Sequence, residues 1–299
     1  MDSLISDAIG DLGPDGAPGP VGAPCYVIHA PDEQKLPLVV ASAHSGRAYT
    51  REFIATARLD ELTLRRSEDS YVDEIFVAAP NLGAPLLAAS FPRAFCDVNR
   101  EAWELDPAMF EDALPPWVNT TSPRVGAGFG TIARVVANGE AIYGIRLRFA
   151  EAERRVQGYW RPYHAALAAL VEATRARFGV CLLVDCHSMP ASATAAQAPP
   201  PDVVLGDAYG AACAPALVRH ADAFFAARNY VTRRNDPYAG GYVTRHYGQP
   251  RRGVHALQIE FARRLYMDET TLVKHPGFTR LATDATALLP TLAEIAQAL

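Results

Sequence analysis

The chain has 299 residues, of which 49% are hydrophobic and 20% are charged, and its formal net charge is −5. This length and apolar content allow one large core, so we expect residues 25–299 to form a single domain. The acidic balance argues against a general nucleic-acid-binding protein, and no apolar run approaches the roughly 20 residues that cross a bilayer. The N-terminus lacks the basic and apolar regions of a secretory signal, so a cytoplasmic protein is the expectation.

Residues 1–24 are predicted to be a flexible leader, because residues 10–24 are too rich in glycine and proline for a regular element. Two apolar segments follow, residues 25–29 and residues 36–43. The short polar segment between them suggests a hairpin or a pair of adjacent strands. The folded domain is therefore expected to begin near residue 25.

Strands and helices are predicted to alternate over the rest of the chain. The longest helical pattern spans residues 151–178, where apolar side chains recur on one face and Gly179 stands just past the end. Such alternation implies a mixed, mostly parallel sheet covered by helices on both faces, which is an α/β fold. The other expected elements are helices at 48–66, 71–79, 211–228 and 276–299, strands at 85–90, 180–185, 202–206 and 255–261, and a glycine- and tyrosine-rich loop at 235–248.

Two of the predicted strands lead to a histidine followed by a serine. Residues 36–43 run directly into His44, and residues 180–185 are followed within two positions by His187. Ligands bind at the carboxyl ends of strands in open α/β sheets, and neutral imidazole is the commonest metal ligand in proteins. The sharper interpretation is a metal site. The plainer one is that each histidine only makes hydrogen bonds at the end of its strand.

The cysteines do not suggest a disulfide framework, because their number is odd and none has CxxC spacing. Several stand in apolar or strand-like surroundings, where a thiol behaves as a small hydrophobic group. We expect all of them to be reduced and mostly buried: Cys25, Cys96, Cys181, Cys186 and Cys213.

Several motifs follow one another in a fixed order between about residue 36 and about residue 270: HSGRAY, EDSYVDEIF, FPRAFCDVNR, AIYGIRL, YHAALAAL, DCHSMP, DVVLGD, NDPYAGGYVTRHYG and LQIEFARRLYMDE. In these motifs the chain resembles the N-formylglutamate amidohydrolase family, a zinc-dependent branch similar to the carboxypeptidase-type hydrolases. The resemblance implies a single α/β domain with a zinc-carboxypeptidase-like, phosphorylase/hydrolase-like fold. Ala43 is a departure, since the family usually has proline before His44.

The resemblance implies a zinc ion held by His44, His187 and a carboxylate of the EDSYVD stretch. Asp69 would stand at a helix N-terminus and point back toward the strand ends, whereas Asp73 is one turn further along the same face. We expect Asp69 to be the ligand. Asp73 is then the alternative ligand or an acceptor for a histidine N–H. Without a metal, Asp69 would be a helix cap and Asp73 an exposed helix charge.

Glu260 stands inside an apolar predicted strand, where a carboxylate is costly unless it is paired or functional. The resemblance makes it the general base, and it makes Arg93 the residue that polarises the scissile carbonyl and stabilises the oxyanion. The plainer interpretations are that Glu260 pairs with Arg263 or Arg264 and that Arg93 is a surface arginine.

Asn99, Arg100 and Arg245 are the candidates for binding substrate carboxylates, since guanidinium groups bind carboxylates through two parallel hydrogen bonds. Tyr242 is expected to line the same pocket, although the aromatic residues of its loop could equally serve only to pack the loop. His164, on the buried face of the long helix, is interpreted as a core histidine rather than a ligand.

The resemblance implies a zinc-dependent amidohydrolase that cleaves N-formyl-L-glutamate to formate and L-glutamate, as in histidine degradation. The expected partner is a small N-acyl amino acid. Two alternatives stay open at the level of sequence. One is hydrolysis of another N-acyl amino acid or a small peptide on the same scaffold, and the other is a metal-binding protein without turnover. A base and arginines beside the metal favour catalysis.

Overall fold

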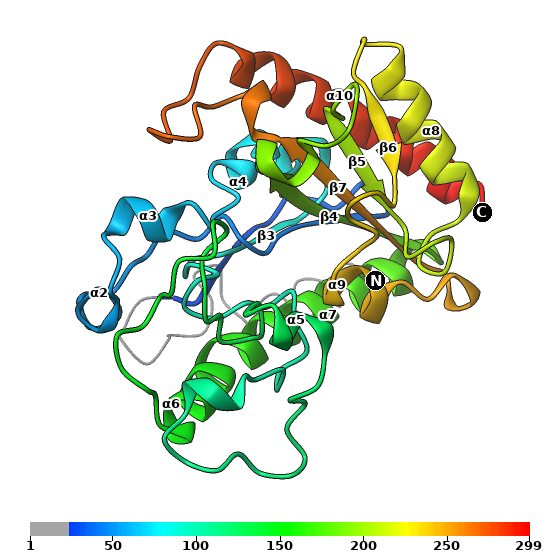
Figure 1. Ribbon diagram of the computed structural model, residues 1–299. Coiled ribbons are helices and arrows are strands. Elements are labelled where there is room, and N and C mark those ends of the chain that lie inside the picture. The colour runs from blue at the N-terminus through cyan, green and yellow to red at the C-terminus, as the bar shows by residue number, and fades with distance from the viewer. Residues whose placement is uncertain (1–23) are drawn as a thin grey trace.

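A computed structural model describes residues 24–299 and contains a seven-stranded sheet in the order β1-β3-β2-β4-β7-β5-β6 (Figure 1). The predicted leader lies outside the described residues except for Pro24. Four neighbouring pairs run parallel, and the pairs β1–β3 and β5–β7 run antiparallel. The strands are β1 (Tyr26–His29), β2 (Leu38–Ser42), β3 (Leu86–Ala89), β4 (Cys181–Met189), β5 (Val203–Gly206), β6 (Thr232–Arg234) and β7 (Val254–Ala262).

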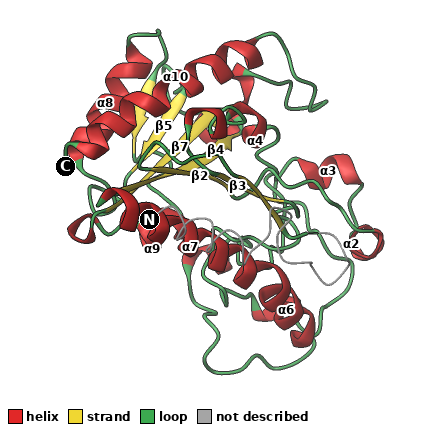
Figure 2. Ribbon diagram, turned by 180° about the vertical axis from the view of Figure 1, so that it is seen from behind, coloured by secondary structure: helices red, strands yellow, loops and turns green. Residues whose placement is uncertain are grey.

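Helices cover both faces of this sheet (Figure 2). The long helix is built from three joined parts: α6, a π-helical turn (Val156–Trp160) and α7. The α-helices described are α2 (Arg51–Thr56), α3 (Glu61–Arg65), α4 (Val72–Ile75), α5 (Pro123–Gly126), α6 (Phe149–Arg155), α7 (Arg161–Phe178), α8 (Pro215–Ala226), α9 (Tyr242–Tyr247) and α10 (Gly277–Gln297).

The central strands β4 and β7 are buried on both faces, and successive side chains enter different cores. Leu182 and Val184 point into the core formed with α4, α8 and α10. Cys181 and Leu183 point into the core formed with the π-helical turn and α7 on the opposite face. This alternation decides which side chains can reach a common site, because every second residue of a strand lies on the same face.

The expected mixed, mostly parallel sheet with helices on both faces is confirmed, but the expected pairing of its first two strands is wrong. β1 pairs with β3 in antiparallel register, and β3 lies between β1 and β2. Tyr26 stands opposite Ala89, although 63 residues of sequence separate them. The short connection between β1 and β2 favours a hairpin, but β2 instead pairs in parallel with β3 and β4, which are distant in sequence.

The helix expected to run as far as Arg66 is broken into α2 and α3. Thr50 caps α2 by accepting a hydrogen bond from the backbone N–H of Phe53, and Asp60 caps α3 in the same way through Thr63. The helix expected at 71–79 is likewise shorter, since α4 has four residues and a 3₁₀ turn (Pro80–Leu82) follows.

Strand β6 and helices α5 and α9 were not predicted. The edge strand β6 has three residues, all polar, which gives no apolar pattern. Helix α9 occupies the segment expected to be a loop, and it begins after a glycine that has no capping side chain. Its first turn is capped instead by Asn99, whose Oδ1 accepts the N–H of Val243 at 2.8 Å and whose backbone carbonyl accepts that of Tyr242 at 3.2 Å. Local sequence cannot reveal such a distant cap.

Other expectations are confirmed. The strands expected at 36–43, 85–90, 180–185, 202–206 and 255–261 are present, and the long helix ends at Gly179 in the left-handed conformation. All five cysteines are free and buried. Within the described residues, no helix is long and apolar enough to span a membrane.

Candidate metal centre and active-site cavity

Four polar side chains share one face of the two central strands. Asp185 and His187 alternate along β4, and Gln258 and Glu260 alternate along β7, with Asp185 paired to Gln258 and His187 paired to Glu260 across the parallel ladder. Nearer the amino ends of β4 and β7, the side chains on this face are apolar and pack against α7. The four polar side chains follow them on the same face, at the carboxyl ends of the strands. All four are buried. The sheet thus places a cluster of polar groups where a parallel sheet binds ligands.

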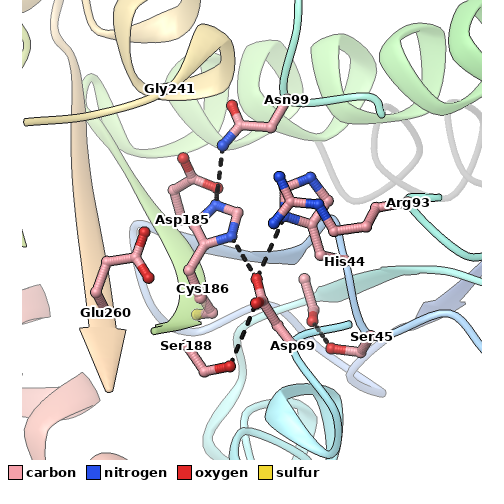
Figure 3. A network of polar contacts seen from close by, with 12 residues as sticks. His44, Ser45, Asp69, Arg93, Asn99, Asp185, Cys186, Ser188, Gly241 and Glu260 are labelled. Carbon is pink, nitrogen blue, oxygen red and sulfur yellow. Dashed lines mark hydrogen bonds and ion pairs between the residues drawn. The ribbon is translucent and has the colours of Figure 1, made fainter. Parts of the chain in front are cut away.

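His44 and Asp69 lie close to His187 of this cluster. Figure 3 shows His44 and Asp69 in the same polar network as Asp185. His44 follows β2, which neighbours β4, and its backbone carbonyl accepts the N–H of Asp69 at 3.0 Å. Oδ2 of Asp69 lies 3.3 Å from Nδ1 of His44 and 2.9 Å from Nδ1 of His187. One ligand atom from each residue lies within 4.8 Å of the others, a spacing that can hold a metal ion.

The opposite nitrogen of each imidazole meets a buried carboxylate. Nε2 of His44 lies 2.7 Å from Oδ1 of Asp97, and Nε2 of His187 lies 2.9 Å from Oδ1 of Asp185. In a neutral imidazole a carboxylate acceptor keeps the proton on Nε2, so Nδ1 directs a lone pair at Asp69. Two such lone pairs and a carboxylate oxygen repel one another unless a metal ion lies among them or a second proton on the imidazoles takes its place. The donor set therefore fits a divalent metal.

The charges around this centre are strongly coupled. Burial lowers the pKa of His187, but the carboxylates of Asp185 and Asp69 outweigh it and hold that pKa well above its usual range. Burial raises the pKa of Asp69, yet hydrogen bonds from His187 and His44 hold it well below its usual value. The pKa of Asp97 is likewise held low, against burial, by His44, Arg100 and Arg93. The carboxylates are thus ionised and attract positive charge to the centre.

The second oxygen of Asp69 is held by the protein. Oδ1 accepts a hydrogen bond from the hydroxyl of Ser188 at 3.2 Å and lies 3.4 Å from Nη2 of Arg263. Arg263 is itself fixed, because its Nε contacts Ser188 at 3.2 Å and its Nη1 donates to the carbonyl of Arg66 at 2.8 Å. These contacts leave Oδ2 of Asp69 directed at the two histidines.

Asp73, the alternative carboxylate, does not reach the histidines. Its carboxylate lies 3.0 Å from Nη2 of Arg47, and its backbone N–H donates to the hydroxyl of Ser45. Asp69 also differs from its expected position, because α4 begins after Tyr71, which has a φ of 67°. Asp69 therefore stands in the loop before the helix, and the role of a simple helix cap does not apply.

Glu260 stands beside His187 without an arginine partner. Within residues 24–299 its carboxylate accepts one hydrogen bond, from Nε2 of Gln258 at 2.9 Å. Arg263 is engaged with Asp69 and Arg264 with Asp202, so neither takes the pairing considered from sequence. Burial raises the pKa of Glu260 to about 7, although positive charge at His187 opposes the shift. A carboxyl with this pKa can accept and release a proton near neutral pH.

Gln258 connects Glu260 to the segment before α9. Its Oε1 accepts the N–H of Gly241 at 2.9 Å, which fixes the amide so that Nε2 faces Glu260. Thr244 on α9 donates its hydroxyl to Oδ2 of Asp185 at 2.9 Å. Helix α9 therefore contributes to the orientation of both the proposed base and a carboxylate behind His187.

A cavity of about 640 Å³ is lined by His44, Asp69, His187, Gln258 and Glu260. Arg93, Arg100 and Arg245 all line it, as does Asn99. Nη2 of Arg93 lies 2.8 Å from Oδ2 of Asp97, so this guanidinium is tied to the carboxylate behind His44 and is not a surface group. Tyr242, expected in the pocket, is not among the lining residues, and its ring stacks on His246 instead.

Asn99 and Arg100 are largely committed to contacts within the protein. Nδ2 of Asn99 lies 3.1 Å from Nε2 of His187. Arg100 donates from Nε to the carbonyl of Phe129 and from Nη1 to the carbonyl of Asn99, both at 2.8 Å. His164 is a core histidine as expected: its Nε2 meets the carbonyl of Val98 at 2.8 Å, and burial lowers its pKa to about 4.

Sequence reasoning missed several residues of the centre: Asp97, Asp185, Ser188, Gln258 and Arg263. The spacing Asp-x-His on one strand and Gln-x-Glu on the next could have revealed Asp185 and Gln258, since side chains two apart on a strand share a face. The contacts of Asp97 and Arg263 depend on long-range folding that leaves no local pattern.

Comparisons with known proteins point to one family. Residues 36–267 match the family profile described as N-formylglutamate amidohydrolase. An N-formylglutamate deformylase of Pseudomonas putida is 29% identical over 240 residues, and one of Pseudomonas aeruginosa is 31% identical over 239 residues. In both cases the alignment covers 79% of this chain and 84% of the relative.

A comparison with solved structures points to the same family. The crystal structure of N-formylglutamate amidohydrolase from Ralstonia eutropha JMP134 is 38% identical with a TM-score of 0.85, covering 91% of this chain and 98% of that one. A gene product of Agrobacterium tumefaciens, 16% identical with a TM-score of 0.58, shares the fold over 91% of this chain and 95% of its own. From the profile match and these relatives, the chain belongs to the N-formylglutamate amidohydrolase family.

Proposed function

We propose that this protein is a zinc-dependent amidohydrolase that cleaves N-formyl-L-glutamate to formate and L-glutamate. The observation that carries the proposal is the convergence of His44, Asp69 and His187 next to Glu260. Two histidines and one carboxylate form a recognised ligand set for catalytic zinc, and it leaves a coordination position free. The names of the relatives, N-formylglutamate deformylase and amidohydrolase, support the substrate.

The charge of the cavity supports a dianionic substrate. Five arginines and three carboxylates line it, which leaves an excess of two positive charges when the histidines are neutral. The whole chain carries a formal charge of −5, so this cavity is a positive region in an acidic protein. Such a region attracts an anion such as N-formyl-glutamate, whose two carboxylates are ionised at neutral pH.

A bound zinc ion would supply Lewis acidity for the formyl carbonyl and the attacking water. Glu260 accepts the proton that this water loses and then delivers it to the departing amine nitrogen, which turns the amine into a good leaving group. Its pKa of about 7 suits both directions of transfer. The carboxylates of Asp97 and Asp185 keep the two imidazoles in one orientation during the reaction.

Arg93 is assigned to the developing oxyanion. Its contact with Asp97 leaves Nε and Nη1 without a hydrogen bond among the described residues. A fixed cation directed at an oxygen that gains charge stabilises the transition state more than the ground state. Arg245 is assigned to a substrate carboxylate, because it lines the cavity and only its Nε is bound, to the carbonyl of Gly240 at 3.1 Å.

The test compares metal-stripped protein with protein reloaded with one equivalent of zinc, using release of L-glutamate from N-formyl-L-glutamate. Activity should depend on the metal. Glu260→Gln should retain zinc yet lower kcat by roughly 10²-fold or more, the usual contribution of general base catalysis. Glu153→Gln, at an exposed glutamate on α6, is the matched control and should not change kcat. Equal kcat in Glu260→Gln and the wild type would remove Glu260 from the mechanism.

A further inference from the structure

The five arginines that line the cavity differ in how many of their donors are free: Arg93, Arg100, Arg124, Arg245 and Arg263. A guanidinium binds a carboxylate bidentately through one of two edges, Nε with Nη2 or Nη1 with Nη2. A guanidinium that already pairs with carboxylates or carbonyls of the protein has fewer of its five N–H donors left for a substrate.

Three of these arginines are already engaged with the carboxylates of the site. Arg263 uses Nε, Nη1 and Nη2 for Ser188, the carbonyl of Arg66 and Asp69. Arg100 uses Nε and Nη1 for two backbone carbonyls, and its Nη2 lies 3.8 Å from Oδ2 of Asp97. Arg93 uses Nη2 for Asp97 at 2.8 Å.

The other two arginines keep an edge. Arg245 spends only Nε and keeps the edge formed by Nη1 and Nη2. The side chain of Arg124 makes no hydrogen bond within residues 24–299, so both of its edges are free. Its one charged partner is Glu104, whose Oε1 lies 3.9 Å from Nη1, too far for a hydrogen bond.

Arg124 is nevertheless held at the cavity. It stands in the short helix α5, which Ser122 caps by accepting the N–H of Val125 at 3.2 Å. The carboxylate of Glu104 is buried, its Oε2 has no hydrogen-bond partner, and it attracts the guanidinium without occupying its donors. The Arg124 side chain is 38% exposed and lines the cavity, so a ligand can reach its free edges.

We infer that Arg124 binds one of the two carboxylates of the substrate and that Arg245 binds the other. The inference rests on the proposed function and replaces Arg100 as a carboxylate receptor. Arg100 instead joins the carbonyls of Asn99 and Phe129, which holds the segment containing Phe129 against the residues behind His187. It is thus a positioning residue, and Arg124 is a specificity-determining one.

Three substrates separate the two carboxylates: N-formyl-L-glutamate has both, N-formyl-L-glutamine only the α-carboxylate, and N-formyl-L-isoglutamine only the γ-carboxylate. Arg124→Met should lower kcat/KM for N-formyl-L-glutamate roughly 30-fold, mainly through KM, because one charge-assisted pair is lost. It should lower kcat/KM similarly for one of the two amides and leave the other unchanged. Arg245→Met should show the opposite pattern between the amides.

Arg148→Met is the matched control, since Arg148 is 78% exposed and is not among the residues that line the cavity. Its kcat/KM should equal that of the wild type for all three substrates. An unchanged kcat/KM for N-formyl-L-glutamate in Arg124→Met would overturn the inference, and so would an equal loss on all three substrates, which indicates a structural role. Failure of the wild type to hydrolyse any of them would instead refute the proposed function.

Discussion

The carboxylate of Asp185 lies 2.9 Å from Nε2 of His187, two residues along the same strand and on the same face of the sheet. Strand β4 is rigid and fully buried, so this contact fixes the ring of His187 with Nδ1 directed at Asp69. A ligand and the group that orients it are therefore held by one strand.

Removing this acceptor should weaken metal binding. Asp185→Asn keeps the size of the side chain but loses the charge that stabilises the proton on Nε2, and such changes cost 10- to 100-fold in metal affinity. Competition with a chromogenic chelator measures the zinc Kd directly. Asp73→Asn is the control, because Asp73 pairs with Arg47 and should not affect the Kd. If the two variants bind zinc equally, Asp185 does not orient a ligand.

Arg263 should be important for folding as well as for the site. Arg263→Met leaves Oδ1 of the buried Asp69 carboxylate without its arginine partner, and breaking a buried pair from one side costs about 3 kcal/mol or more. Urea unfolding of the metal-free protein should reveal this loss. The neighbouring Arg264 is 36% exposed and pairs with Asp202, so Arg264→Met should cost less than about 1 kcal/mol. Equal losses would contradict the assignment.

Gly241 stands where no larger residue fits. A Cβ there would lie 2.3 Å from Nδ2 of Asn99, so either Asn99 or the start of α9 must move. Both contact the centre, through His187 and Gln258, and a misplacement of about 1 Å can cost about 10²-fold in rate. Gly241→Ala should therefore lower kcat/KM by that order. Gly126→Ala, where a Cβ meets nothing within 4 Å, should not lower kcat/KM. Equal kcat/KM values in the two variants would argue against a role of Gly241 in positioning Asn99 and α9.

The buried neutral His164 predicts a loss of stability in acid. Burial lowers its folded-state pKa to about 4 from a usual value near 6.5, so between these values the unfolded chain binds a proton that the folded protein does not. Stability should therefore fall as the pH falls from about 6.5 to 4, by about 3 kcal/mol from this residue. Urea unfolding at pH 7 and pH 4.5 checks this, since His164→Gln should lose less stability than the wild type over the same range.

The strands that carry the site could be predicted from sequence because each is a short run of apolar residues followed by polar ones. Residues 36–43 and 180–185 show this pattern, and β2 and β4 follow it closely. β4 extends further than expected, through His187 to Met189, because β7 pairs with it along its whole length. A single strand cannot indicate the length of its partner.

The choice between Asp69 and Asp73 could not be made from helical spacing alone. Spacing assumes a regular helix, but Tyr71 adopts a left-handed backbone conformation that separates Asp69 from α4. The hydrogen bond from Asp69 N–H to the carbonyl of His44 then draws the two residues together. Helix α9 escaped prediction for a similar reason, since its cap comes from Asn99, far away in the chain.

The alternation of side chains along β4 also places a thiol and the polar residues on either side of it on opposite faces of the sheet. Cys186 lies between Asp185 and His187, yet its thiol points through the sheet into the core beneath α8 and α10. A thiolate would compete strongly for zinc, but here the sheet itself lies between sulfur and metal ligands, and burial raises the pKa of this thiol well above its usual range. Reaction of Cys186 with an alkylating reagent therefore requires the central strands to separate, which makes this thiol an internal reporter of global unfolding rather than of active-site access.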